Sequence, residues 1–220
     1  MPRKTKTEAQ ATREGLLDAA EEEFLEQGVS RTTLDSIAQR AGVTRGAIYW
    51  HFRNKTDLFN AMLDRVQLPM IELLSELHDD DESAPCENLR KLCLFALYKL
   101  VSDARHRRVH AILFHRCEHV DEINSSVQRQ NVLINRMLAS LTRYFKGAAK
   151  RGDLRADVRP EIAARAVHVY MTGLYSDWLR NPEDFNLQLC VESLIDVLLG
   201  GLLRDPPAFT RQCVFRDHAS

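Results

Sequence analysis

Basic and aromatic side chains gather in one short stretch, residues 45 to 51, where they could make hydrogen bonds to nucleic acid. Arg45 offers a planar fork of N–H donors that matches the O6 and N7 acceptors of guanine. Tyr49 and a neutral His51 can each donate a hydrogen bond to a phosphate oxygen. Trp50 has two interpretations, since it could face the DNA or pack against the preceding helix. This chemistry predicts a helix that lies in the major groove of DNA.

The residues around this stretch predict the two helices that would position it. Apolar residues recur at i, i+3, i+4 and i+7 before it, which gives a first short helix one apolar face. These residues are Leu34, Ile37, Ala38 and Ala41. Gly42 follows where a helix ends in a left-handed residue, and Thr44 is placed to cap the second helix. Ile48 and Phe52 then point inward from the second helix, as in a helix-turn-helix.

Small and capping residues add to the predicted DNA contacts. Thr44, at the start of the second helix, can offer hydroxyl and amide donors to a phosphate. Gly46 has no side chain, so the helix can approach the groove closely. The first helix has two candidate caps, Thr32 and Thr33, with Asp35 as a capping-box partner for Thr32.

A family resemblance emerges at these residues. The DNA-binding signature of the TetR family of repressors resembles residues 32 to 59, TTLDSIAQRAGVTRGAIYWHFRNKTDLF. Two further segments, MPRKTKTEAQATREGLLDAA and ILFHRCEHVDEI, are similar to the AcrR/TtgR-type branch, which represses multidrug efflux pump operons. The first match is very specific, and a looser match runs over most of the chain. The resemblance implies that Lys55, in the first turn of the next helix, contacts a phosphate.

The charge distribution favours DNA binding although the net charge of the 220 residues is only −1. Residues 40 to 55 contain Arg40, Arg45, Arg53 and Lys55 and no acid. A basic footprint on a nearly neutral protein suits a DNA binder that must also dissociate.

Composition also indicates where in the cell the protein is located. The chain has no apolar run of 18 residues and its N-terminus is too polar for a signal peptide, so we expect no membrane partner. Its five cysteines are an odd number without a CxxC pair, which favours free thiols and a cytoplasmic location.

Helical periodicity continues through the rest of the chain, and no stretch alternates as a strand. We expect a first helix from Thr12 to Gln27 and a long helix from Asn54 to Leu77, with a kink or short break before Pro69. Body helices are predicted at about 89–100, 105–119, 121–151, 160–180 and 187–203.

The body is predicted to bind a small lipophilic effector, such as an antimicrobial, in a mostly apolar cavity with a few polar groups. The helix at 160–180 carries a partly polar stripe, and two earlier helices would face it. The predicted lining residues are Leu92, Cys93, Ala96, His110, Leu113, Phe114, His168, Met171, Thr172 and Ser176. The alternative is that His110 and His168 are ordinary core or surface residues.

A metal or redox sensor is the rival interpretation of the body. His106 and His110 are spaced i, i+4, as are His115 and His119, but nine residues separate the pairs. That offset puts the pairs about 180° apart on a helix, so one metal ion cannot use both. Cys117 has only Arg116 beside it to lower its pKa. We therefore predict no metal site and no cofactor.

The last two helices are predicted to form a homodimer, because their apolar circumference is too wide for burial on one side. Gly200 and Gly201 would permit close helix contact, and Val167, Tyr170, Leu174 and Trp178 could contribute. Two heads on a two-fold axis would match a palindromic operator in double-stranded DNA.

Together these observations predict an all-α fold: an N-terminal three-helix helix-turn-helix head joined to a C-terminal helical ligand-binding and dimerisation bundle. The expected division is residues 1–55 for DNA binding and 56–220 for ligand binding and dimerisation. The predicted function is a DNA-binding transcriptional repressor, of a multidrug efflux operon as the resemblance implies, which a lipophilic ligand releases from its operator. The alternative is the same head with a redox- or metal-responsive body. No nucleophile–base pair, phosphate loop or acidic dyad indicates an enzyme.

Overall fold

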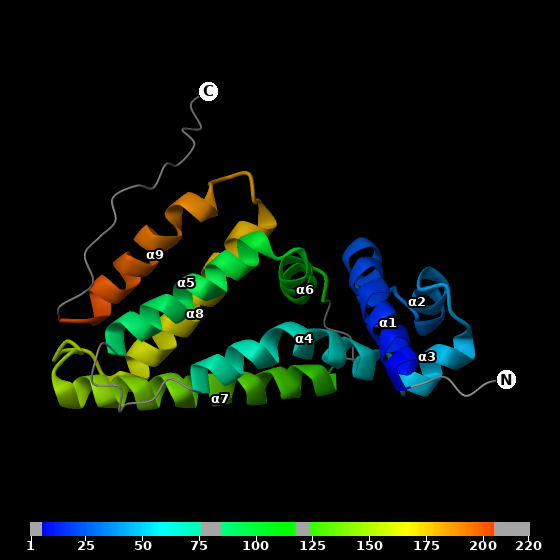
Figure 1. Cartoon of the computed structure of the whole chain (residues 1–220). Helices are drawn as coiled ribbons and strands as arrows, with labels where there is room; N and C mark the ends of the chain where they lie inside the picture. The colour runs from blue at the N-terminus through cyan, green and yellow to red at the C-terminus, as the bar shows by residue number, and fades with distance from the viewer. Residues whose placement is uncertain (1–5, 76–84, 118–123, 205–220) are drawn as a thin grey trace, which may run out of the picture. The chain divides into compact units, whose positions relative to one another are not determined.

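The computed structural model describes residues 6–75, 85–117 and 124–204. The regular secondary structure of these residues is entirely helical (Figure 1). The helices are α1 (Lys6–Gln27), α2 (Leu34–Arg40), α3 (Arg45–His51), α4 (Lys55–Ser75), α5 (Pro85–Ser102), α6 (Ala104–His115), α7 (Asn124–Arg151), α8 (Pro160–Arg180) and α9 (Leu187–Leu202). Outside the helices, Leu154 and Leu203 form an isolated antiparallel bridge. The predicted all-α class is confirmed. No helix in the described ranges is both long and apolar enough to cross a membrane.

The helices divide into two compact units, which we describe separately. The first unit comprises Met1–Leu68 and Arg108–Gln130, and the second comprises Pro69–Arg107 and Asn131–Ser220. Helices α4, α6 and α7 each contribute residues to both units.

The first unit contains the predicted helix-turn-helix head around a continuous apolar core. Leu17 and Phe24 of α1 are fully buried there, as is Ile48 of α3. The ring of Phe24 meets the ring of Phe59 edge to face, with 5.8 Å between centroids. Val109 of α6 is also fully buried in this core, a contribution that the sequence periodicity had assigned to the body.

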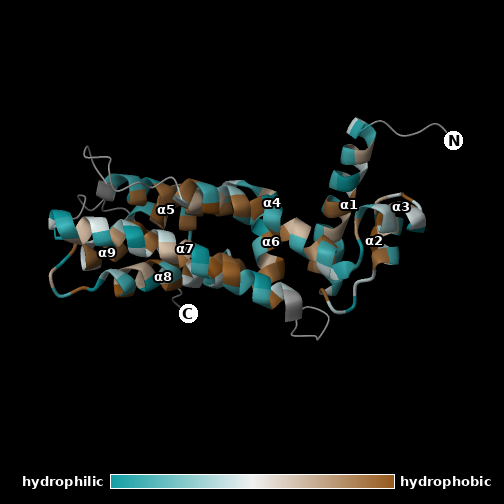
Figure 2. Ribbon diagram, turned by 90° about the horizontal axis from the view of Figure 1, so that it is seen from below, coloured by the Kyte–Doolittle hydropathy of each residue, from teal (hydrophilic) through white to brown (hydrophobic). Residues whose placement is uncertain are grey.

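Helix α1 begins at Lys6, six residues before the predicted start. Its first turns have few apolar residues, and Figure 2 shows them in the hydrophilic colour. A local polar contact supports them instead: the Gln10 side chain donates a hydrogen bond to the Glu14 carboxylate at 2.8 Å. Such i, i+4 contacts stabilise a helix without the apolar periodicity on which the prediction relied.

The turn after α2 contains the predicted left-handed glycine, but the cap of α2 is not the predicted capping pair. Gly42 has φ +67, the left-handed conformation that glycine adopts without steric cost. The cap of α2 is Thr33, whose side chain accepts from the Ser36 N–H, while the Ser36 side chain accepts from the Thr33 N–H. The pairing of Thr32 with Asp35 was wrong, because Thr32 is buried and donates its hydroxyl proton to the Gly28 carbonyl.

Helix α4 starts as predicted and continues through its proline. The Asn54 side chain accepts from the Asp57 N–H at 2.8 Å, and the Asp57 carboxylate accepts from the Arg53 N–H at 3.1 Å. Pro69 lies inside the helix, which extends to Ser75 without the short break that was one of the expected outcomes.

In the second unit, α5 packs against both α8 and α9, as Figure 1 also shows. The buried carboxylate of Asp196 on α9 accepts two hydrogen bonds from Arg90 on α5, at 2.6 and 3.2 Å. On α8 the Tyr170 hydroxyl donates to the Leu194 carbonyl of α9 at 2.9 Å. These bonds fix the packing of α5 and α8 on α9 beyond what apolar contact specifies.

Candidate nucleic-acid interface and effector site

Helix α3 is held by its inner residues and its cap. Ile48 is fully buried and Phe52 is 2% exposed, so the helix cannot rotate about its axis without exposing apolar surface. The Thr44 side chain accepts a hydrogen bond from the Ala47 N–H at 3.3 Å, as predicted for a cap. The Arg13 guanidinium lies over the Phe52 ring, 5.1 Å from its centroid. The outer face of α3 is therefore presented in a defined orientation.

That outer face carries the predicted DNA-contacting side chains. The Arg45 side chain is 72% exposed, and its guanidinium lies over the Tyr49 ring at 5.6 Å. Trp50 is 72% exposed, which excludes the alternative that it packs against α2, and its ring meets the His51 ring edge to face at 4.6 Å. At Gly46 an added Cβ would meet no atom within 4 Å, so the space beside the helix is open.

The predicted basic footprint is narrower in the structure than in the sequence. Arg40 is surrounded by Glu22, Glu23 and Glu26 of α1, which raise its pKa through hydrogen bonds, first of all from Glu26. Its charge is thus largely compensated within the head. Arg45 is also paired with an acidic residue, because its Nε lies 3.2 Å from the Asp35 carboxylate.

Lys55 makes contacts within the head that the resemblance did not indicate. Its ammonium donates to the Ser30 carbonyl at 3.2 Å and to the Thr32 carbonyl at 3.1 Å. These bonds tie the start of α4 to the loop between α1 and α2. Lys55 therefore has a positioning role within the head, and its predicted phosphate contact remains a prediction.

A buried carboxylate joins α1 to two other helices of the first unit. Glu21 is 0% exposed, and it accepts hydrogen bonds from Arg65 of α4 at 3.2 Å and from Arg108 of α6 at 3.0 Å. Arg65 also donates to Asp18 at 2.7 Å. A buried carboxylate is costly unless cations pair with it, so any movement of α4 or α6 that separates this cluster has an energetic cost in the head.

The predicted effector residues divide between the two units. From α6, His110 stacks on Phe114 with 6.3 Å between centroids, and Leu113 packs against the core of the head; all three belong to the first unit. In the second unit, Cys93 and Ala96 of α5 are buried and Leu92 is half-buried.

Helix α8 supplies the polar part of the predicted effector site. The predicted α8 residues are all half-buried: His168, Met171, Thr172 and Ser176. Burial, together with Arg165, lowers the pKa of His168, which favours the neutral imidazole at neutral pH.

Sequence reasoning missed a buried polar chain in the second unit. The Tyr175 hydroxyl donates to the Ala96 carbonyl at 2.8 Å, so the His106 Nε2, 3.1 Å from the same oxygen, acts as the donor to it. From the sequence, His106 was considered only as a possible ligand, with His110, in the rival metal-sensor interpretation. Across the described ranges, no group of three His, Cys, Asp or Glu side chains could hold a metal ion, and His119 lies outside these ranges.

The cysteines correct one expectation. Cys190 is disulfide-bonded, whereas the sequence favoured free thiols throughout. Cys93 and Cys117 are free. Burial raises the pKa of Cys93 to about 12 and also raises the pKa of Cys117, so both favour the protonated, unreactive thiol.

Helices α8 and α9 each carry exposed apolar side chains. Ile162 and Val169 of α8 are 53% and 58% exposed, and Leu189 and Val197 of α9 are 55% and 61% exposed. Val167 and Trp178, which the sequence suggested could contribute to a dimer interface, are instead buried inside their own chain. We call the four exposed residues, Ile162, Val169, Leu189 and Val197, the α8–α9 face.

Two known protein families match separate parts of the chain. Residues 16–62 match the family described as bacterial regulatory proteins, tetR family, and residues 84–203 match the MAATS-type transcriptional repressor, C-terminal region. The HTH-type transcriptional regulator TtgR of Pseudomonas putida is 40% identical over 211 residues, which cover 96% of this chain and 100% of TtgR.

Two solved structures agree with this assignment. The structure of NalD, the secondary repressor of the MexAB-OprM multidrug efflux pump in Pseudomonas aeruginosa, aligns with a TM-score of 0.83 and 41% identity over 91% of this chain and 100% of NalD. A complex of triclosan with SmeT, the repressor of the Stenotrophomonas maltophilia multidrug efflux pump SmeDEF, aligns with a TM-score of 0.81 and 34% identity over 91% of this chain and 98% of SmeT. The chain belongs to the TetR family and is a DNA-binding transcriptional repressor.

Proposed function

We propose that this protein is a cytoplasmic homodimer that represses a multidrug efflux operon and leaves its operator when a small lipophilic molecule binds its body. The observation that carries the proposal is the outer face of α3, which holds Arg45, Tyr49 and Trp50 exposed on a capped helix. Similarity to the efflux repressors NalD and SmeT over most of the chain supports the choice of target genes.

Residues 1–55 form the DNA-binding part in this proposal, and residues 56–220 bind the effector and the second protomer. Arg45 reads a guanine, while Thr44, Tyr49, His51 and Lys55 contact phosphates or the groove edge. Before Arg45 can do so, it must exchange its ion pair with Asp35 for the DNA. Counterion release makes the binding fall steeply as salt rises.

The α8–α9 face forms the dimer interface. Ile162 and Val169 lie seven residues apart on one side of α8, with the exposed Gly173 four residues further on. Leu189 and Val197 are followed on α9 by the exposed Gly201 at the same i+4 spacing. Small residues beside exposed apolar residues permit close helix contact, and a two-fold axis pairs such a face with itself.

In this proposal, the ligand releases the protein from its operator through the helices that the two units share. α4 and α6 contribute residues to the second unit and also hold Arg65 and Arg108, the partners of buried Glu21. A ligand that favours another arrangement of these helices changes the orientation of the head. It acts only through its difference in affinity between the two arrangements, and a shift from 1:99 to 99:1 requires about 5.5 kcal/mol.

A fluorescence-anisotropy titration with DNA from upstream of this gene and its neighbours tests the proposal. We expect saturable binding that triclosan or another lipophilic antimicrobial weakens. Arg45→Ala should lose affinity, whereas Arg143→Ala, which removes an exposed arginine of α7, provides a charge-matched control. If the protein bound none of this DNA, the proposal that it represses neighbouring genes would be refuted. If it bound DNA but no compound weakened the binding, the proposal of a lipophilic effector would be refuted.

A further inference from the structure

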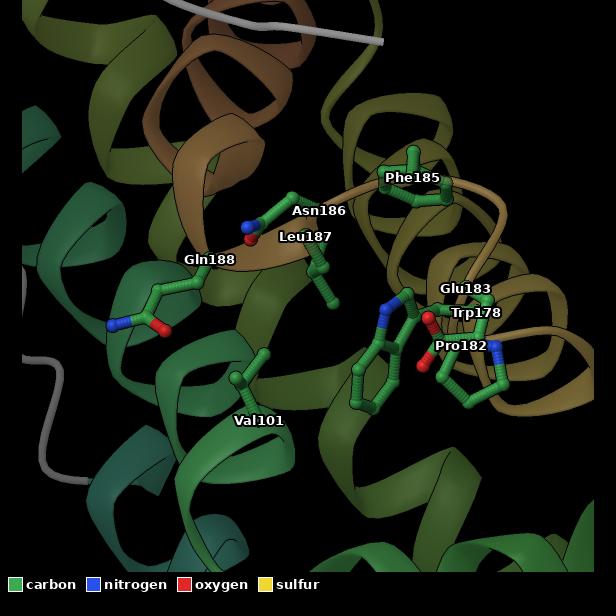
Figure 3. A pocket seen from close by; sticks show the side chains of 8 residues that line it. All are labelled: Val101, Trp178, Pro182, Glu183, Phe185, Asn186, Leu187 and Gln188. Carbon is green, nitrogen blue, oxygen red and sulfur yellow. The ribbon is translucent and has the colours of Figure 1, made fainter. Parts of the chain in front are cut away.

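A cavity of about 260 Å³ lies in the second unit, and none of the residues assigned to the effector site line it (Figure 3). Val101 at the end of α5, Trp178 of α8 and Leu187 of α9 supply apolar walls, and Phe185 of the α8–α9 turn completes them. Typical cavities for drug-sized ligands measure about 300–1,000 Å³, so this one suits a molecule with a single ring.

One buried donor in the wall has no acceptor. Trp178 is 7% exposed, and its indole Nε1 is buried without a hydrogen-bond partner in the structure. Figure 3 shows this nitrogen on the side of the ring nearer to Leu187, while the six-membered ring lies nearer to Val101. A buried N–H without a partner destabilises the folded state, so an acceptor atom in the cavity would recover that free energy.

The polar residues of the rim select the charge of the occupant. The Asn186 Oδ1 already accepts from the Leu189 N–H at 3.3 Å to cap α9, which leaves its amide hydrogens as donors. The carboxylate of Glu183 also lines the cavity and repels an anion. The walls therefore match an apolar molecule that carries an uncharged acceptor.

We propose that this cavity binds a small uncharged aromatic molecule whose carbonyl or hydroxyl oxygen accepts a hydrogen bond from the Trp178 Nε1. The site joins α5, α8 and the turn before α9 through one ligand. It is independent of the effector and operator proposals, because it uses none of their residues.

Indole N–H resonances of the ¹⁵N-labelled full chain provide the test, because the chain has only two tryptophans, Trp50 and Trp178. Trp178→Phe assigns the second resonance. Acetophenone should shift it downfield in a saturable way, while the resonance of exposed Trp50 stays in place. Ethylbenzene has a similar shape without the acceptor and should bind about tenfold more weakly. Benzoate should bind poorly in the wild type and better in Glu183→Gln.

A cavity-filling variant keeps the test decisive if Trp178→Phe fails to fold. Val101→Phe narrows the space while it leaves the indole intact, and it should abolish the acetophenone shift; Val132→Phe, on the exposed surface of α7, should retain it. The proposal is overturned if saturating acetophenone leaves the Trp178 resonance unmoved, or if Val101→Phe responds like the wild type. A resonance that shifts with protein dilution but not with the ketone would show that a second protomer fills the cavity, which also overturns it.

Discussion

Arg108 of α6 donates a hydrogen bond from its Nη2 to the fully buried Glu21 of α1 across 3.0 Å. A second donor, Arg65 of α4, reaches the other carboxylate oxygen of Glu21 at 3.2 Å. One carboxylate thus depends on two helices that also extend into the second unit.

Glu21→Gln should lower the stability of the protein markedly, because it leaves two partly buried guanidinium groups without their common anion. Loss of one partner of a fully buried pair costs about 3–5 kcal/mol, and the partial exposure of Arg108 reduces the expectation to about 2–4 kcal/mol. Urea denaturation measures the change. Glu26→Gln, at an exposed carboxylate bound to Arg40, is the matched control and should leave the unfolding midpoint unchanged. Equal effects of the two variants would contradict the role given to Glu21.

Arg45→Ala should weaken operator binding about ten- to hundredfold without loss of stability, since a bidentate arginine–guanine contact contributes about 1–3 kcal/mol and the side chain is 72% exposed. Tyr49→Ala should weaken binding less and almost equally on all sequences, as expected for a phosphate contact. Anisotropy titrations at several salt concentrations check both variants, with circular dichroism to verify folding. If both retained the wild-type affinity, the assignment of the outer face of α3 to DNA would be wrong.

Asp35→Asn should strengthen DNA binding. It removes a carboxylate that pairs with Arg45 at 3.2 Å and that repels phosphate. Exposed ion pairs contribute about 0.2–1 kcal/mol, so we expect a gain of about two- to fivefold at low salt that disappears as salt rises. Weaker binding by this variant would instead mean that Asp35 holds Arg45 in its binding position.

Val197→Arg should shift the protein from dimer to monomer, because it places a charge at the most exposed residue of the α8–α9 face. Sedimentation velocity gives the mass, and loss of the dimer should also weaken binding to a two-site operator. Val132→Arg, at an α7 position that is 59% exposed, should remain dimeric. A dimeric Val197→Arg variant would place the interface elsewhere.

Cys93 should resist alkylation at pH 8 in the folded protein, because burial raises its pKa to about 12 and keeps the thiolate scarce. Since the folded pKa lies above the unfolded value of about 8.5, Cys93 contributes stability below that pH and loses the contribution as pH rises toward 12. Iodoacetamide labelling read by mass spectrometry should modify Cys93 only after unfolding. Rapid labelling of Cys93 or Cys117 in the folded chain would revive the redox-sensor alternative.

The helix-turn-helix could be predicted closely because its signals are local. Gly42 needs the left-handed conformation, Thr44 caps α3, and Ile48 and Phe52 determine which face is buried. The start of α1 at Lys6 was missed because polar i, i+4 contacts left no apolar period to detect.

Long-range partners could not be predicted in the same way. An apolar stripe shows that a side chain is buried but not by what, so Val109 was assigned to the body and Trp178 to the dimer. The bond of His106 to Tyr175 joins residues 69 positions apart, and no sequence spacing indicates it. The carboxylates around Arg40 likewise come from another helix, which narrowed the basic footprint.

Val109 and Ile112 have a consequence for the order in which the chain folds during synthesis. Both are fully buried in the core of the head, and the Arg116 carbonyl accepts from the Val29 N–H at 3.1 Å. Although domains generally fold as units from the N-terminus as they leave the ribosome, the first 68 residues here lack these groups. The DNA-binding head therefore reaches its complete packing only after α6 has emerged, so a nascent chain stalled before that helix exposes an unfinished apolar core.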